Sequence, residues 1–152
     1  MQTDQRIIDA LIRCYNAEIE TVMNYLANSV NLDGVRAKHI KTALADDVQE
    51  ELTHAQTLAK RIKTIGGVVP GSHGLEWTQK MMQPPKDTTD TVSVIKGVIA
   101  AEEAAIAGYE EVIKLCEGTD YATQDMAITL LADEQEHRRE FIGFLKEYEQ
   151  SP

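Results

Sequence analysis

The sequence predicts an all-α fold, a four-helix bundle with up-down-down-up topology and one long crossover between the second and third helices. Apolar residues recur at three- and four-residue steps in four stretches, about residues 4–30, 35–65, 89–117 and 121–148, which is the period of a helix with one buried face. No stretch alternates with period two for long enough to form a strand. We expect a single domain over residues 1–152, because a chain of this length encloses a sizeable core.

The breaks between these stretches set the topology. Short turns at residues 31–34 and 118–120 make the first and second helices antiparallel, and likewise the third and fourth. The remaining connection, about residues 66–88, is rich in Gly and Pro and has enough residues to run the full length of the bundle. It would leave the second and third helices parallel.

Composition excludes several classes of protein. The 15 Lys and Arg residues face 25 Asp and Glu, and a net charge of −10 argues against nucleic acid as a partner. The N-terminus has no signal-peptide layout and no apolar run approaches the length of a membrane span, so we expect a cytoplasmic protein with no membrane partner. Cys14 and Cys116 form no Cys-x-x-Cys pair and are expected to fill the core.

Ionisable residues interrupt the apolar face of every predicted helix. The first and third helices each carry a lone glutamate there, and the second and fourth each carry a Glu-x-x-His motif. The six residues are Glu18, Glu51, His54, Glu102, Glu134 and His137. A buried network of ion pairs is the alternative, but no Lys or Arg stands nearby on the same faces to neutralise the carboxylates. A bound cation is therefore expected among them.

The spacing and chemistry of these six residues indicate which cation is expected. Residues three apart on a helix lie on one face, so each Glu-x-x-His presents a carboxylate and an imidazole together. Four carboxylates and two imidazoles are a mixed oxygen and nitrogen set suited to iron or manganese. One glutamate from each of two helices plus Glu-x-x-His from the other two is the arrangement of di-iron carboxylate bundles. We expect two iron ions per chain, with Mn or Zn as possible substitutes.

An internal repeat strengthens this prediction. The lone glutamates stand 84 positions apart and the two Glu-x-x-His motifs 83 apart. Tyr25 and Tyr109 each follow their lone glutamate by seven residues. Tyr25 is a candidate catalytic residue, as an electron donor or as a hydrogen-bond partner of a ligand, with core packing as the alternative; the case for Tyr109 is weaker.

At these residues the sequence resembles the ferritin-like superfamily, and the bacterioferritin family most closely. The motifs that carry the likeness are Ala17-Glu18, Tyr25, Glu51-x-x-His54, the Ile62-x-x-x-Gly66-Gly67 end of the second helix, Ala100-Ala101-Glu102-Glu103 through Gly108-Tyr109, and Asp133-Glu134-x-x-His137. The resemblance covers nearly the whole chain except the crossover. It favours Glu102 over Glu103 as the ligand, as the apolar face does independently.

The resemblance implies a ferroxidase that oxidises Fe(II) with O2 or H2O2, for iron storage or detoxification in a homo-oligomeric shell. Bacterioferritins bind haem through a methionine after the first glutamate of Glu-x-x-His; Leu52 stands there, so haem is not expected. The sequence stops at Pro152, just past the fourth helix, which favours a twelve-subunit, Dps-like shell over one of twenty-four. A rubrerythrin-like peroxidase, a manganese catalase and a non-catalytic metal-binding bundle remain as alternatives.

The sequence also supports expectations for two further groups of residues, one acidic and one apolar. Asp46, Asp47 and Glu50 precede the first Glu-x-x-His, and we expect them on a solvated face, with the lining of a shell cavity as the alternative. Apolar residues of the crossover are expected to be exposed, where they either contact another subunit or cover the bundle. They are Leu75, Trp77, Met81 and Met82.

Overall fold

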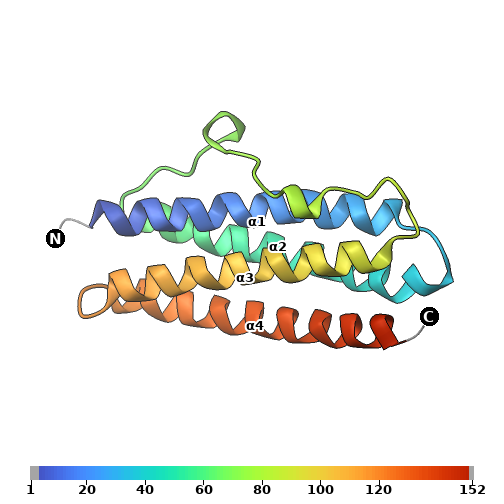
Figure 1. Ribbon diagram of the computed structural model, residues 1–152. Coiled ribbons are helices and arrows are strands. Elements are labelled where there is room, and N and C mark those ends of the chain that lie inside the picture. The colour runs from blue at the N-terminus through green and yellow to red at the C-terminus, as the bar shows by residue number, and fades with distance from the viewer. Residues whose placement is uncertain (1–3, 151–152) are drawn as a thin grey trace.

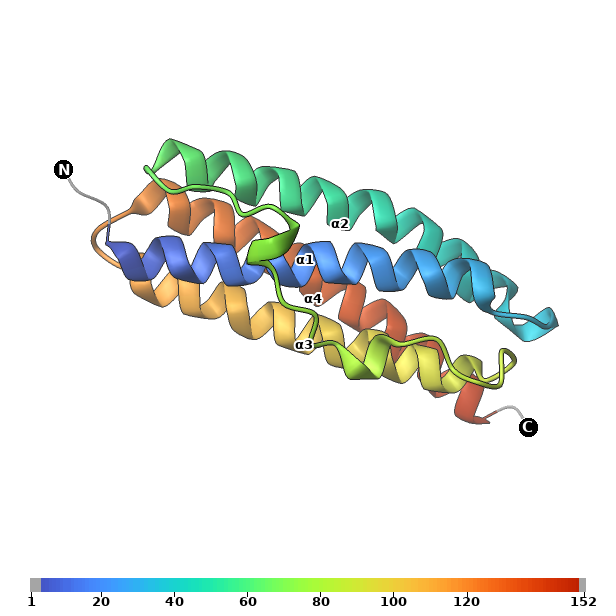
Figure 2. The same ribbon diagram turned by 90° about the horizontal axis from the view of Figure 1, so that it is seen from above.

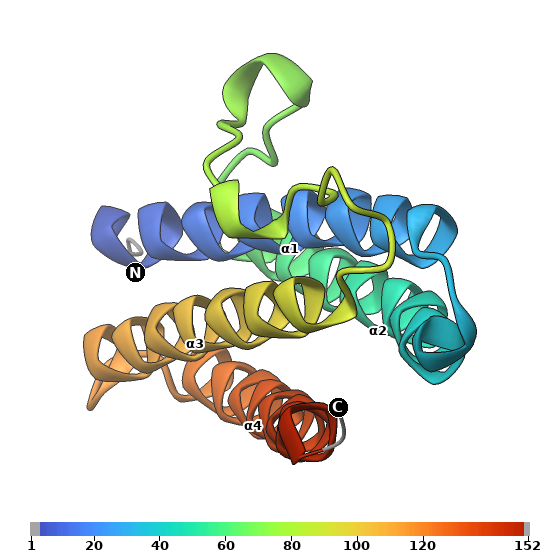
Figure 3. The same ribbon diagram turned by 45° about the vertical axis from the view of Figure 1, so that its right-hand side comes forward.

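The computed structural model describes residues 4–150 and confirms the all-α prediction (Figure 1). The long helices are α1 (Gln5–Asn31), α2 (Lys38–Thr64), α3 (Thr91–Cys116) and α4 (Tyr121–Gln150), and the described part of the chain contains no strand. Three short 3-10 turns join them: η1 (Val35–Ala37), η2 (Ser72–Gly74) and η3 (Lys80–Met82). As predicted, α1 and α2 are antiparallel, α3 and α4 are antiparallel, and the crossover leaves α2 and α3 parallel (Figures 1 and 3).

Local sequence explains where the helices begin and end. Asp4, Asp90 and Asp120 each accept a backbone N–H from two or three residues further on, at 2.9–3.1 Å, and so satisfy donors that a helix start leaves free. Gly66 ends α2 with φ of 97°, a conformation that glycine adopts without a steric penalty. Among the helices of residues 4–150, none is long and apolar enough to cross a membrane.

The core consists of two apolar clusters, one toward each end of the bundle. The cluster near the start of α1 includes Leu11, Leu58 and Tyr109, and the cluster near its end includes Leu44 and Phe141. Between them lies a layer of polar side chains contributed by all four helices. The burial of apolar side chains on both sides fixes the helices that carry this layer.

The crossover starts beside α2, passes over α1 and continues along α3, as the view from above shows (Figure 2). Asn16 of α1 exchanges two hydrogen bonds of 2.7 Å with the backbone of Glu76. The buried carboxylate of Glu20 accepts the backbone N–H groups of Thr78 and Gln79 at 3.0 and 2.7 Å. These contacts satisfy backbone groups that an irregular segment does not pair by itself.

The same row of α1 continues toward its C-terminal end. The side chain of Asn24 donates to Gln79 at 3.0 Å, and that of Asn28 donates to the Met82 carbonyl at 2.9 Å. A Cβ at Gly97 of α3 would come within 2.3 Å of the crossover backbone, so only glycine permits this approach. We call the four α1 residues, spaced four apart, the α1 ladder: Asn16, Glu20, Asn24 and Asn28.

The expectation that the crossover's apolar residues are exposed was wrong for Met82. Trp77 and Met81 are half exposed, but Met82 is 1% exposed and belongs to the apolar cluster near the end of α1. The hydrogen bond from Asn28 holds the backbone at this point against the bundle, which turns the Met82 side chain inward.

Candidate metal centre

The six residues predicted from the apolar faces meet in the polar middle layer. All are buried, with exposures between 1% and 8%. Their oxygen and nitrogen atoms form two overlapping groups, within each of which one atom per residue lies within 4.8 Å of the others. One group is Glu18, Glu51, His54 and Glu134, and the other is Glu51, Glu102, Glu134 and His137. Glu51 and Glu134 are common to both, and so lie where a carboxylate would bridge two ions.

The first group surrounds one nitrogen of His54. Nδ1 of this imidazole lies 2.7 Å from Glu134 Oε1, 3.5 Å from Glu51 Oε2 and 3.6 Å from Glu18 Oε2. These atoms converge on one point from α1, α2 and α4.

The second group repeats the pattern around His137. Its Nδ1 lies 3.0 Å from Glu51 Oε1 and 3.7 Å from Glu102 Oε1. The His54 and His137 rings lie 6.3 Å apart, centroid to centroid, and are inclined by 24°. The two groups are therefore related by the internal repeat, with α1 and α2 exchanged for α3 and α4.

The other nitrogen of each imidazole faces a carboxylate on the outer side of the centre. His54 Nε2 lies 3.0 Å from Asp133, and His137 Nε2 lies 2.9 Å from Glu50 and 3.9 Å from Asp47. A carboxylate in this place fixes the orientation and the tautomer of a histidine whose first nitrogen binds a metal.

These contacts on the outer side of the centre correct the expectation for Asp47 and add Asp133 to the candidate site. Asp46 and Glu50 are exposed as expected, but Asp47 is 8% exposed, and burial raises the pKa of its carboxyl to about 7. Asp133 was singled out only as part of a motif; its contact with His54 depends on how α2 and α4 pack and has no signal in either helix alone.

The electrostatics of the centre are those of a site that lacks positive charge. Burial raises the pKa of Glu18, and it raises that of Glu134 to about 12, with the nearby Glu18 carboxylate adding to the shift. Burial alone would lower the pKa of His54 and His137, but the facing carboxylates outweigh it and the pKa of both imidazoles is raised. The raised pKa values mean that protons compete with a metal for these donor atoms.

Several buried polar atoms at the centre have no hydrogen-bond partner. They are Glu18 Oε2, Glu51 Oε1, His54 Nδ1, Glu102 Oε2, Glu134 Oε1 and both ring nitrogens of His137, whose Nε2 lies 2.9 Å from Glu50 without the alignment of a hydrogen bond. The 2.7 Å approach between His54 and Glu134 is close enough for a hydrogen bond but does not have the alignment of one. Unsatisfied buried groups are costly, and one from each of the six residues at the same place is what a pair of bound cations would satisfy.

Two tyrosines hold the lone glutamates, each from the opposite half of the repeat. Tyr25 on α1 donates its hydroxyl hydrogen to Glu102 on α3, and Tyr109 on α3 donates to Glu18 on α1 at 2.9 Å. Burial and the adjacent carboxylates raise the pKa of both phenols, which keeps them protonated as donors. Tyr109 therefore matches Tyr25 in position, although the sequence made the weaker case for it; the shared seven-residue offset was its signal.

Four long helices that direct four carboxylates and two imidazoles into a common layer define the class of helical bundles with an internal carboxylate–histidine cluster that could hold metal ions. Comparison with known proteins places the chain within that class. The ferritin-like domain family matches residues 8–151, and the chain belongs to this family, which confirms the resemblance found in the sequence.

The chain is similar to several known proteins over most of their length. The chain is 26% identical over 145 residues to a DNA protection during starvation protein of Pyrococcus furiosus, covering 93% of this chain and 77% of that protein. It is 26% identical over 144 residues to a bacterial ferritin of Neisseria meningitidis, covering 93% and 87%. Among solved structures, a dodecameric thioferritin, the bacterioferritin-related protein from Bacteroides fragilis, superposes with a TM-score of 0.87 at 24% identity, covering 98% of this chain and 89% of that one.

Proposed function

We propose that this protein is a ferroxidase that oxidises Fe(II) to Fe(III) with O2 or H2O2 at a centre of two irons, as part of iron storage or detoxification in an oligomeric shell. The observation that carries the proposal is the pair of overlapping donor groups that share Glu51 and Glu134. A site for a single ion would need only one of these groups. Membership of the ferritin-like family supports iron as the substrate.

The donor set suggests how the residues divide their roles. Glu51 and Glu134 would be shared by the two substrate irons, while Glu18 with His54 and Glu102 with His137 would complete the two ends. Two adjacent Fe(II) ions supply two electrons to one oxidant, which avoids one-electron products. The protein fixes the geometry, and its imidazoles and Glu134 give up their protons when metal enters.

The tyrosines position the terminal glutamates. A hydroxyl donor on one oxygen of Glu18 or Glu102 leaves the other oxygen free for metal. Tyr25 is in addition a candidate electron donor, because its hydroxyl touches a proposed ligand directly.

The test is an aerobic titration of metal-free protein with Fe(II), followed by ferric absorbance on material of known assembly size. We expect a break at two irons per chain, followed by slower uptake into an assembly of about twelve subunits, as in the dodecameric relative. A break with no further uptake would retain the oxidase and remove storage. If no break occurs, the centre is not an iron oxidation site, and manganese with a catalase assay is the next measurement.

A further inference from the structure

One face of the proposed centre adjoins a cavity that none of the proposed ligand roles uses. A space of about 220 Å³ lies between α1 and α3 and reaches Glu18 and Tyr109. Most of the remaining lining is small: Ala10, Cys14, Ala17, Ala104, Ala105 and Gly108. Larger residues at these positions would fill the space, so the small side chains keep a passage open beside a proposed ligand.

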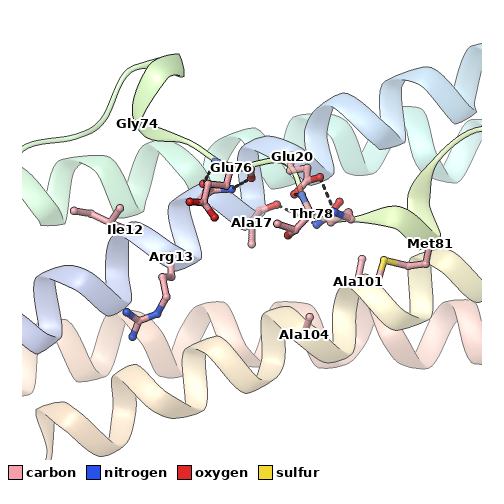
Figure 4. Close-up of a pocket in the computed structure, with 12 residues that line it drawn as sticks. Ile12, Arg13, Ala17, Glu20, Gly74, Glu76, Thr78, Met81, Ala101 and Ala104 are labelled. Carbon is pink, nitrogen blue, oxygen red and sulfur yellow. Dashed lines mark hydrogen bonds between the residues drawn. The ribbon is translucent and has the colours of Figure 1, made fainter.

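A neighbouring cavity lies beneath the crossover. This second cavity, of about 500 Å³, shares Arg13, Ala17 and Ala104 with the first (Figure 4). Its roof is the crossover segment that the α1 ladder holds, from Glu76 to Met81. The two cavities lie along the seam between α1 and α3, and the first of them reaches Glu18.

The corresponding positions in the other half of the repeat carry larger side chains. A shift of 84 residues carries Cys14 to Val98 and carries Asn24 to Gly108. Val98 is fully buried in the same apolar cluster as Met82, and Asn24 is hydrogen-bonded to Gln79 of the crossover. The crossover therefore seals the half with Tyr25 and leaves the half with Tyr109 open.

The residues that line the two cavities indicate what kind of molecule enters the α1–α3 seam. The guanidinium of Arg13, which lines both cavities, lies 2.8 Å from the Glu111 carboxylate, so a cation and an anion balance at this point. Carboxylates beside the imidazoles lie instead on the α2–α4 side, at Asp47, Glu50 and Asp133. The linings also include Glu18, Glu20 and Glu76, so charge does not distinguish the two sides. The apolar lining at Ala10 and Ala105 instead favours a small neutral molecule, which has no tightly held hydration shell to lose there.

We propose that the α1–α3 seam is the entry port for the neutral oxidant, with Ala104, Gly108 and Cys14 setting the size of molecule that passes to the Glu18–Tyr109 end of the centre. This inference rests on the proposed ferroxidase function and adds the route and size limit of its second substrate. Gly108 lines the first cavity, and a Cβ there would come within 3.2 Å of the Cys14 sulfur.

The test compares Ala104→Leu with Ala107→Leu. Both alanines are exposed on α3, but only Ala104 lines the cavities. The assembled proteins are loaded anaerobically with Fe(II) and mixed with O2, H2O2 or the bulkier tert-butyl hydroperoxide. We expect Ala104→Leu to slow oxidation by H2O2 about fivefold or more and by the bulky peroxide further, while Ala107→Leu retains the wild-type rates and both variants bind Co(II) like wild type.

A second measurement does not depend on iron. Crystals under xenon pressure are expected to hold xenon beside Cys14 and Tyr109 in the wild type and in Ala107→Leu, but not in Ala104→Leu. Wild-type oxidation with equal rates for the two variants would overturn the port alone. A wild type that binds metal without rapid oxidation would overturn the ferroxidase function, and the port with it.

Discussion

The two ends of the metal centre have nearly the same donors and different surroundings. Glu18 and Glu102 each accept a tyrosine hydroxyl from the opposite half of the repeat, and each lies near an imidazole. One end is covered by the crossover and Met82, whereas the other adjoins the cavity at Cys14. The repeat thus preserves the groups proposed to hold metal, and the single crossover makes the surroundings of the two ends unequal.

The largest effect is expected from removing a carboxylate that both ends share. Glu51→Ala should lower the rate of rapid Fe(II) oxidation about 100-fold or more, because both irons lose one of the two carboxylates that they share. The bundle should still fold, since the change removes one of several crowded buried carboxylates, as circular dichroism would show. Glu103→Ala, which alters an exposed neighbour of Glu102, is the control; an unchanged rate in Glu51→Ala would refute the assignment.

Removing one lone glutamate should separate the two ends. Glu18→Ala and Glu102→Ala each leave one donor group intact, so the Co(II) titration break is expected to fall from two ions per chain to one. Isothermal titration calorimetry measures this directly. If either variant still binds two ions with wild-type affinity, that glutamate is not a ligand and the repeat does not define two equivalent ends.

Proton competition should affect both ends alike. The pKa of His54 and His137 is raised above the ordinary 6.5 in the folded, metal-free protein, so metal binding must displace protons and Co(II) affinity should rise with pH. In the metal-free protein, stabilisation by the protonated imidazoles is complete below the unfolded pKa near 6.5 and is lost as pH rises toward the folded pKa.

Thermal melts between pH 6 and pH 9 would test whether the stability of the metal-free protein falls as pH rises. The metal-free Tm should fall as pH rises above about 6.5, and the Tm of the Co(II)-loaded protein should not follow it. Parallel curves for the two forms would mean that protons and metal do not compete for the same atoms.

The smallest effect, and the sharpest comparison of the two ends, comes from the tyrosines. Tyr25→Phe and Tyr109→Phe each remove one hydroxyl donor from a lone glutamate, and we expect losses of about two- to tenfold in oxidation rate for either. If Tyr25 also donates an electron, a tyrosyl radical signal in rapid-freeze EPR should disappear in Tyr25→Phe and persist in Tyr109→Phe. A radical that survives in Tyr25→Phe would leave Tyr25 a positioning residue.

Sequence predicted the helices and brought out the six central residues for one physical reason. A charged residue on an otherwise apolar helical face is visible without knowledge of the neighbouring helices, as at Glu18 and Glu102. Contacts between elements had no such signal. Asp133 reaches His54 only through the packing of α4 against α2, and Met82 is buried because Asn28 binds its backbone.

The α1 ladder was equally hidden, since its partners are mostly backbone atoms of an irregular segment without a period. Asn16, Glu20, Asn24 and Asn28 do share a four-residue spacing on one helix, which is recognisable once the path of the crossover is known.

The ladder has a mechanical consequence for the whole bundle. Apolar packing fixes which face of α1 is buried, but because it is non-directional it opposes a small roll of the helix about its own axis less strictly than a directed hydrogen bond does. Hydrogen bonds directed from Asn16 to Asn28 along one edge of α1 stop that roll, and Glu18 and Tyr25 lie on the same rigid cylinder. The crossover therefore fixes the rotation of α1 about its own axis. Replacing the crossover with a flexible linker of equal length should leave the bundle folded but turn the proposed ligand on α1 out of alignment.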